Sequence, residues 1–212
     1  MRLFVCSDIH MAVENLERLL LMAGKPIDAV LFAGDLTNWG SAADAAKVFS
    51  SFPDKPIFTI PGNLDTQAVL EAMEDQTKLV HNHKAALGDW SVVGFGGGSL
   101  NNPGDILFSD DDILKSLEPL LKAANPKKTI LLTHQPPFNT KLDVSRGSHV
   151  GSRAVRVLIE KYQPAFQFCG HIHESWSEDE IGKSRCYNVA AVKEGRSAVL
   201  DLETFVFKRL AL

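Results

Sequence analysis

The chain has 212 residues, 45% of them apolar and 23% charged, a composition typical of a globular protein that buries a core of its own. Its formal net charge of −4 argues against a protein that coats nucleic acid, because such binding depends on an excess of lysine and arginine. Three widely spaced cysteines, Cys6, Cys169 and Cys186, argue against a disulfide framework or a CxxC metal site and favour a reducing compartment.

The N-terminal segment, MRLFVCSDIH, has one arginine and a short apolar run before its first polar residues. That run is too short for a signal-peptide core or a membrane span. We therefore expect a cytoplasmic protein with no membrane partner. The sequence shows no repeat, low-complexity tract or linker, and its length favours one domain over residues 1–212.

The N-terminal part of the chain alternates between short apolar runs and segments with helical spacing. Apolar runs at residues 3–7, 29–33 and 56–60 predict three buried strands. Helices are expected over residues 12–23, from Ser41 to about Phe49, and from Asp65 onward. This βαβαβα order predicts parallel strands joined by helical crossovers.

The C-terminal part repeats the alternation and ends in a strand-rich tail. Strands are expected over residues 90–95, 129–133 and 165–169, and helices over residues 110–124 and 151–162. The glycine-rich stretch at residues 96–99 predicts a turn that allows close backbone approach. Residues 185–210 have few helix signals and predict a β-meander.

Five polar motifs each follow a predicted strand, at the edge of the sheet where open α/β folds bind ligands. They are Asp8-Ile9-His10, Gly34-Asp35, Gly62-Asn63-Leu64-Asp65, Thr133-His134 and Gly170-His171-Ile172-His173. Carboxylate, imidazole and amide side chains are ligands of divalent transition metals. Residues two apart on an extended segment point to the same side, so Asp8/His10 and His171/His173 can each converge on a metal pair.

Each motif by itself has an ordinary alternative. Asp35 alone could be a turn or cap residue, His134 a satisfied polar residue, and Gly62-Asn63 a simple turn. Five such motifs at five strand ends favour a metal site over these alternatives.

The ordered series DIH, GD, GN, TH and GHIH resembles the calcineurin-like metallophosphoesterase superfamily, and the likeness spans residues 2–173. The resemblance implies an α/β fold, a four-layer αββα sandwich of two mixed β-sheets flanked by helices. It also implies two divalent transition metal ions, for which Mn, Fe, Zn and Ni all suit this mixed ligand set. By this resemblance Asp8, His10 and His173 hold one ion, Asn63, His134 and His171 hold the other, and Asp35 bridges them.

The activity implied is hydrolysis of a small phosphate ester by a water that the metal pair activates. Two metal ions can clamp the attacking and leaving oxygens and can lower the pKa of a bound water to roughly 7. Asp35 and Asn63 are the expected catalytic ligands. A carboxylate has one oxygen for each ion, and the Asn63 amide contributes an oxygen, also toward the substrate, without adding negative charge near an anionic phosphate.

One position departs from the family pattern. Leu64 replaces a histidine that in the family contacts the phosphate and protonates the leaving group. In this respect the chain resembles a small bacterial and archaeal branch that tends toward phosphodiesters, so we expect a preference for diesters. His149, just ahead of a helix N-terminus that could receive an anion, is the candidate substitute acid, with an exposed loop residue as the alternative.

Other charged residues have weaker signals. Arg146 and Arg153 are candidate substrate-binding residues because guanidinium groups suit phosphate, although exposed arginines are common. His81 and His83 fall in a polar connection and are expected at the surface.

Two other functions remain open at this point. A weak or inactive scaffold of the same fold would have no reason to keep all seven ligand positions. A nuclease would suit the site, but the acidic charge and the lack of a second nucleic-acid-binding domain argue against it. The sequence predicts neither the natural substrate nor the oligomeric state.

Overall fold

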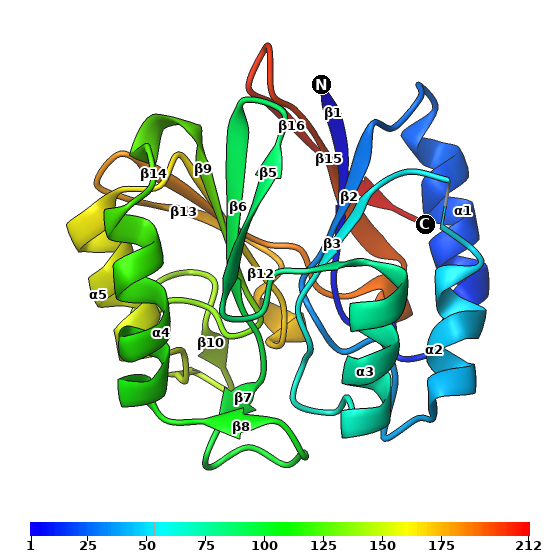
Figure 1. The fold of residues 1–212 in the computed structure, drawn as a ribbon, viewed down its shortest axis with the longest axis horizontal. Helices are drawn as coiled ribbons and strands as arrows, with labels where there is room; N and C mark the ends of the chain where they lie inside the picture. The colour runs from blue at the N-terminus through cyan, green and yellow to red at the C-terminus, as the bar shows by residue number, and fades with distance from the viewer. Residues whose placement is uncertain (53) are drawn as a thin grey trace.

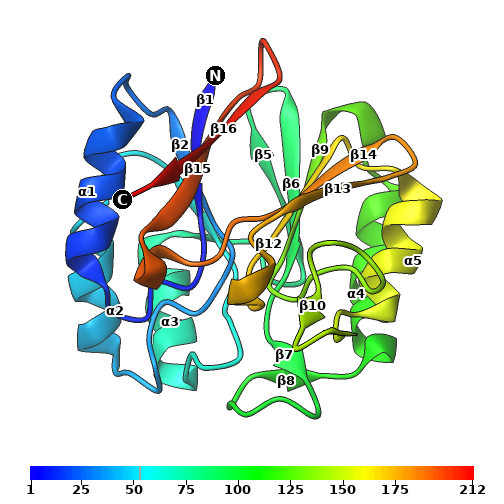
Figure 2. The same cartoon turned by 180° about the vertical axis from the view of Figure 1, so that it is seen from behind.

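Two six-stranded sheets pack face to face in the computed structural model, which describes residues 1–52 and 54–212, and helices cover their outer sides. Figure 1 shows α1, α2 and α3 along one side of this sandwich and α4 and α5 along the other, and Figure 2 shows the same layers from behind. The predicted four-layer αββα arrangement of two mixed sheets is therefore confirmed.

The first sheet has the strand order β16-β15-β1-β2-β3-β4. Its strands are β1 (Arg2–Cys6), β2 (Ala29–Phe32), β3 (Ile57–Thr59), β4 (Lys78–Leu79), β15 (Arg196–Asp201) and β16 (Val206–Ala211). The crossover helices are α1 (Val13–Ala23), α2 (Ala42–Phe49) and α3 (Gln67–Gln76). They make β1 to β4 parallel, whereas β15 and β16 join the sheet antiparallel.

The second sheet has the order β13-β14-β12-β9-β6-β5. Its strands are β5 (His83–Leu87), β6 (Trp90–Phe95), β9 (Thr129–Thr133), β12 (Phe166–Cys169), β13 (Glu178–Ile181) and β14 (Ser184–Asn188). The four central strands run parallel, and the edge strands β5 and β13 run antiparallel. Helices α4 (Asp110–Lys122) and α5 (Arg153–Tyr162) cover its outer face.

Short elements complete the fold around the edge where the parallel strands end. They are the pairs β7 (Gly98–Ser99) with β8 (Leu107–Phe108) and β10 (Val144–Ser145) with β11 (Ser148–His149), and the 3-10 turns η2 (His173–Ser175) and η3 (Val192–Glu194). A further 3-10 turn, η1 (Pro126–Lys128), leads into the start of β9 at the opposite edge.

The alternation of side chains along each buried strand produces the layers. In β1, Phe4 and Cys6 pack among the helices α1 to α3, while Leu3 and Val5 pack against the second sheet. Three apolar cores result, one between the sheets and one under each helical layer. The strands are thus buried on both faces, which is why they are continuous apolar runs.

Helix ends follow the expected capping chemistry with one correction. Ser41 begins α2 with a reciprocal capping box to Asp44, and Ser152 caps α5. The prediction that Asp65 begins a helix is wrong, because Thr66 caps α3 by accepting the Val69 N–H. Asp65 is instead fully buried beside the strand ends.

The predicted tail meander is also wrong. The hairpin β13–β14 belongs to the second sheet, whereas β15–β16 belongs to the first, so the tail crosses between the sheets. No helix in the described part of the chain is both long enough and apolar enough to cross a membrane. All three cysteines are buried and unpaired.

Candidate metal centre

The candidate ligands come from loops that follow five parallel strands of both sheets. Those after β1, β2 and β3 carry Asp8, His10, Asp35 and Asn63, and those after β9 and β12 carry His134, His171 and His173. Because both sets of strands end at the same edge of the sandwich, the two sheets together supply the site.

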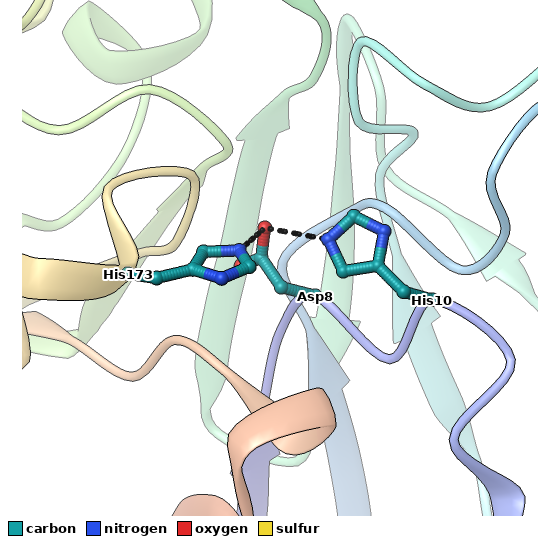
Figure 3. Close-up of side chains that lie close together, drawn as sticks. All are labelled: Asp8, His10 and His173. Carbon is teal, nitrogen blue, oxygen red and sulfur yellow. Dashed lines mark hydrogen bonds and ion pairs between the residues drawn. The ribbon is translucent and has the colours of Figure 1, made fainter.

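Asp8 lies between two of the predicted ligands (Figure 3). His173 Nε2 is 3.2 Å from Asp8 Oδ1, and His10 Nε2 is 3.7 Å from the same oxygen. The ligand atoms of these three residues all lie within 4.8 Å of one another, close enough for one ion. The Nδ1 atom of His10 is buried without a hydrogen-bond partner among the described residues.

A second group of ligand atoms shares Asp8 with the first. The ligand atoms of Asp8, Asp35 and His134 also lie within 4.8 Å of one another. Asp35 Oδ2 is 3.5 Å from His134 Nε2 and 3.8 Å from His10 Nε2, so this carboxylate faces both groups. The His171 ring packs edge-on against the His134 ring with centroids 5.0 Å apart.

Two acceptor oxygens, Asn63 Oδ1 and Asp35 Oδ2, face His134 Nε2 at 3.1 Å and 3.5 Å. His134 Nδ1 is 2.7 Å from the Ala33 carbonyl, which can only accept, so Nδ1 carries a proton and Nε2 has a lone pair whenever the ring is neutral. Asn63 Nδ2 donates to the Pro103 carbonyl, which turns Asn63 Oδ1 toward His134 Nε2 at 3.1 Å. Such a convergence requires either a proton on His134 Nε2 or a metal cation.

Charge around His134 is consistent with this need. Burial would lower the pKa of His134, but the Asp35 carboxylate outweighs burial and raises that pKa to about 9, so a proton fills the position when no metal does. Burial, followed by the nearby His134, lowers the pKa of His171 to about 4 and keeps its imidazole neutral, the form that binds metal. The mixed nitrogen and oxygen set suits a divalent transition metal.

Left-handed turns, rather than strand alternation, bring the ligands together. Asp8, His10, Asp35 and His171 have φ values of 54°, 47°, 57° and 70°, which are uncommon for residues with a side chain. The prediction that the i, i+2 pairs converge because they lie on extended segments is therefore wrong in its geometry. Backbone strain of this kind is concentrated at functional sites.

Two glycines allow the backbone to approach the carboxylates closely. A Cβ atom on Gly62 would lie 1.9 Å from Asp35 Oδ1, and one on Gly170 would lie 2.2 Å from Asp8 Oδ2. Neither position leaves space for any side chain. The glycines of the Gly-Asn and Gly-His motifs are thus part of the site.

Asp65 ties the loops together instead of facing a ligand. Its carboxylate accepts hydrogen bonds from the backbone N–H groups of Leu36, Thr37 and Gly62. Burial, reinforced by the nearby Asp35, raises the pKa of Asp65 to about 6. Leu64, beside it, is half-buried and donates its own N–H to Asp35 Oδ1 at 2.9 Å.

A neighbouring cleft of about 410 Å³ contains two of the remaining candidates. His149 and Arg153 line it together with Phe138 and Gln135, the residue next to His134. Arg153 stacks its guanidinium on the Phe138 ring at 4.0 Å. Arg146 lies elsewhere, at the tip of the β10–β11 hairpin, and lines a separate depression with Glu174 and Trp176.

Sequence reasoning missed Asp143, which pairs with His149. His149 Nδ1 is 2.7 Å from Asp143 Oδ1, and the aspartate side chain is 0% exposed against 39% for the histidine. Asp143 also accepts the backbone N–H groups of Asn139, Thr140 and Gly151. Only a turn signal marks Asp143 in the sequence, because its partner is set by the hairpin.

The placement of His81 corrects another expectation. His83 is exposed, but His81 is partly buried and its ring packs against Phe95 and Phe108 with centroids 4.8 Å and 5.3 Å away. Its Nδ1 accepts the Gly96 N–H at 3.0 Å. Burial lowers the pKa of His81 to about 4.

Solved structures with this fold include metal-dependent phosphoesterases. Protein TT1561 of Thermus thermophilus superposes with a TM-score of 0.76 at 19% identity, covering 99% of this chain and 98% of the other. A dimetal phosphatase from Danio rerio superposes with a TM-score of 0.74 at 10% identity, covering 100% and 96%. At these identities the likeness shows the fold alone.

Sequence comparison identifies the family. The uncharacterised protein MJ1162 of Methanocaldococcus jannaschii is 29% identical over 170 residues, which are 76% of each chain. The family model of the calcineurin-like phosphoesterases, Metallophos, matches residues 1–175. This chain therefore belongs to the calcineurin-like phosphoesterases, as the motif series predicts.

Proposed function

We propose that this protein hydrolyses phosphodiesters with two divalent metal ions, held by Asp8, His10, Asp35, Asn63, His134, His171 and His173. The observation that carries the proposal is the convergence of Asp35 Oδ2, Asn63 Oδ1 and the Nε2 atom of His134 on one point, where a metal cation can replace the imidazole proton. When bound, the metal ions would polarise the phosphoryl oxygens and make a water nucleophilic at neutral pH.

The chain's own residues prepare the site for this chemistry. Asp35 Oδ2 lies 3.8 Å from His10 Nε2 and 3.5 Å from His134 Nε2, so this one oxygen faces both ligand groups and could bridge two ions. The Pro103 carbonyl holds the Asn63 amide with its oxygen inward, which provides a neutral ligand beside an anionic substrate. Both arrangements exist without substrate, and such preorganisation is a main source of rate acceleration.

Leu64 supports the preference for diesters. Its side chain can neither donate a proton nor contact an oxyanion by hydrogen bonding, whereas the family's usual histidine at this position can. A phosphomonoester dianion with a poor leaving group depends more on such a donor than a diester with a better one.

His149 is the proton donor in this proposal. The buried Asp143 carboxylate accepts from His149 Nδ1, which leaves Nε2 as the nitrogen free to exchange a proton in the cleft. Arg153, fixed on Phe138 beside it, would bind a phosphate oxygen or an anionic leaving group. Arg146 lies in a separate depression, so we assign it only to substrates that extend beyond the cleft.

The test compares two substrates on one enzyme. Protein loaded with Mn²⁺ is assayed with bis(p-nitrophenyl) phosphate and with p-nitrophenyl phosphate. We expect faster turnover of the diester and a loss of at least about 100-fold in kcat for Asp35→Asn, because removing one preorganised charge from a reaction centre costs this much. Lys47→Gln, on the outer helix α2, is the matched surface control.

The same assay discriminates the alternatives. A monoester rate far above the diester rate would refute the diester preference. Wild-type protein that takes up no metal and has no activity with Mn²⁺ or Ni²⁺ would instead favour a scaffold. For His149, we expect His149→Ala to lower kcat and remove one limb of its pH profile, while an unchanged profile would leave His149 as an exposed loop residue.

A further inference from the structure

Glu194 contacts the Nδ1 side of His173, a candidate metal ligand. Its Oε1 atom is 3.2 Å from His173 Nδ1, while His173 Nε2 points at Asp8 on the opposite side of the ring. Glu194 lies in η3, beyond residue 175, where the match to the family model ends. We propose that Glu194 is a positioning residue that sets the tautomer and the orientation of His173 for metal binding.

A histidine can bind a metal through Nε2 only when that nitrogen has its lone pair. A carboxylate that accepts from Nδ1–H fixes this tautomer, prevents the ring from flipping and increases the basicity of Nε2. His173 needs such help because it lies in a short 3-10 turn with its side chain 24% exposed, unlike the fully buried His134. The Ala33 carbonyl performs the same service for His134.

Arg196 holds Glu194 in place. Its Nη1 atom is 2.8 Å from Glu194 Oε2 and also donates to the His173 carbonyl at 3.0 Å. The guanidinium lies over the Trp176 ring at 5.2 Å. Arg196 thus links the Glu194 carboxylate to the backbone of His173, which holds the carboxylate close to the imidazole that it contacts.

The backbone of η3 is fixed against the opposite side of the site. The N–H groups of Val192 and Lys193 donate to the carbonyls of Ser7 and Asp8. The Asn15 side chain on α1 donates to the carbonyls of Val192 and Lys193 at 3.1 Å and 3.0 Å. Glu194 therefore projects from a segment that is anchored to the loop of Asp8, the residue on the other side of His173.

The inference rests on the proposed metal centre, and the experiment separates the two. Metal-stripped full-length protein is titrated with Co²⁺, whose visible spectrum reports coordination, as wild type, Glu194→Ala and Glu194→Gln. We expect Glu194→Ala to weaken one of two Co²⁺ sites by about 10–100-fold, the usual effect of removing such a partner. Glu194→Gln should recover most of the affinity because its amide oxygen still accepts from Nδ1–H.

Glu174 offers a matched control. It follows His173 in the same 3-10 turn, but its carboxylate accepts from Ser145 Oγ at 2.7 Å instead of facing the imidazole. Glu174→Ala removes the same charge from the same segment and should leave both Co²⁺ sites unchanged.

A second readout does not depend on affinity. In Zn²⁺-loaded protein, long-range ¹H–¹⁵N spectra should show a protected Nδ1–H on His173 in the wild type, and this signal should be lost in Glu194→Ala. Two unchanged Co²⁺ sites with the Nδ1–H signal retained would overturn the role of Glu194 and leave the metal centre intact. Wild-type protein that binds no Co²⁺ would overturn the metal centre and this inference together.

Discussion

His81 makes the stability of this protein depend on pH in a window that its burial defines. The lowered pKa, about 4 against an ordinary 6.5, arises from burial and from the neighbouring His83. The unfolded chain therefore takes up a proton at a higher pH than the folded chain. The contribution of neutral His81 is fully present above pH 6.5 and is lost as the pH falls toward 4.

The magnitude follows from the two pKa values. The difference between 6.5 and about 4 corresponds to roughly 3 kcal/mol at full effect, and to about 2 kcal/mol at pH 5, because one pKa unit is 1.36 kcal/mol. Structure gives the reason for the loss. Protonation of Nδ1 removes the acceptor for the Gly96 N–H and places a charge between Phe95 and Phe108.

Urea denaturation of wild type and His81→Asn at pH 7 and pH 5 measures the contribution of His81 to the free energy of unfolding. Asparagine keeps an acceptor near the Nδ1 position but has no proton to gain, and all other titrating groups are common to both proteins. The free energy of unfolding should fall by about 2 kcal/mol more in the wild type than in the variant between the two pH values. An equal fall in both proteins would refute the assignment of the effect to His81.

Three further perturbations have defined outcomes. Gly62→Ala would place a Cβ 1.9 Å from Asp35 Oδ1, so Co²⁺ titration should show loss of metal binding together with a lower melting temperature, and a wild-type affinity would contradict the close approach. Asp65→Asn should lower the free energy of unfolding by roughly 3 kcal/mol in urea, because an amide cannot accept from all three backbone N–H groups, whereas a change near zero would show that the loops hold without it. Leu64→His should raise the kcat for p-nitrophenyl phosphate relative to the diester by about 10-fold or more if a proton donor is what the site lacks, and an unchanged ratio would remove that explanation.

Much of the fold could be predicted because local signals and tertiary structure agree. The central strands of both sheets are buried on both faces. For this reason β1, β2, β9 and β12 are apolar runs that end at polar motifs. The helix cap at Ser41 is an equally local signal. These signals also place the candidate ligands, since parallel strands all end at one edge of the sandwich.

What could not be predicted depends on contacts between distant segments. Asp65 follows a strand as a cap residue would, yet three N–H groups from two loops draw its carboxylate inward. The sequence of the tail has strand signals throughout, so nothing local shows that β14 and β15 belong to different sheets. His81 becomes buried only because Phe95 and Phe108 pack around it.

Partner residues of the site are hidden for the same reason. Asp143 acts on His149 across a hairpin, and Glu194 reaches His173 over 21 positions of the chain. Neither carboxylate belongs to a motif with fixed spacing. The assignment of residues 1–212 to one domain stays a prediction. The assignment of the seven ligand residues to two metal ions is also a prediction, which a measurement of metal binding would test.

The candidate ligands divide between the two sheets, with Asp8 and Asp35 from one and His134 and His173 from the other. A bound ion would thus act as a cross-link between two layers whose shared core is built of apolar side chains. The metal would then have a structural role as well as a catalytic one, because it would fix the alignment of one sheet against the other. Amide hydrogen exchange should slow in β1 and β9 together when metal is added, as expected if the bound ion couples the opening of the two sheets.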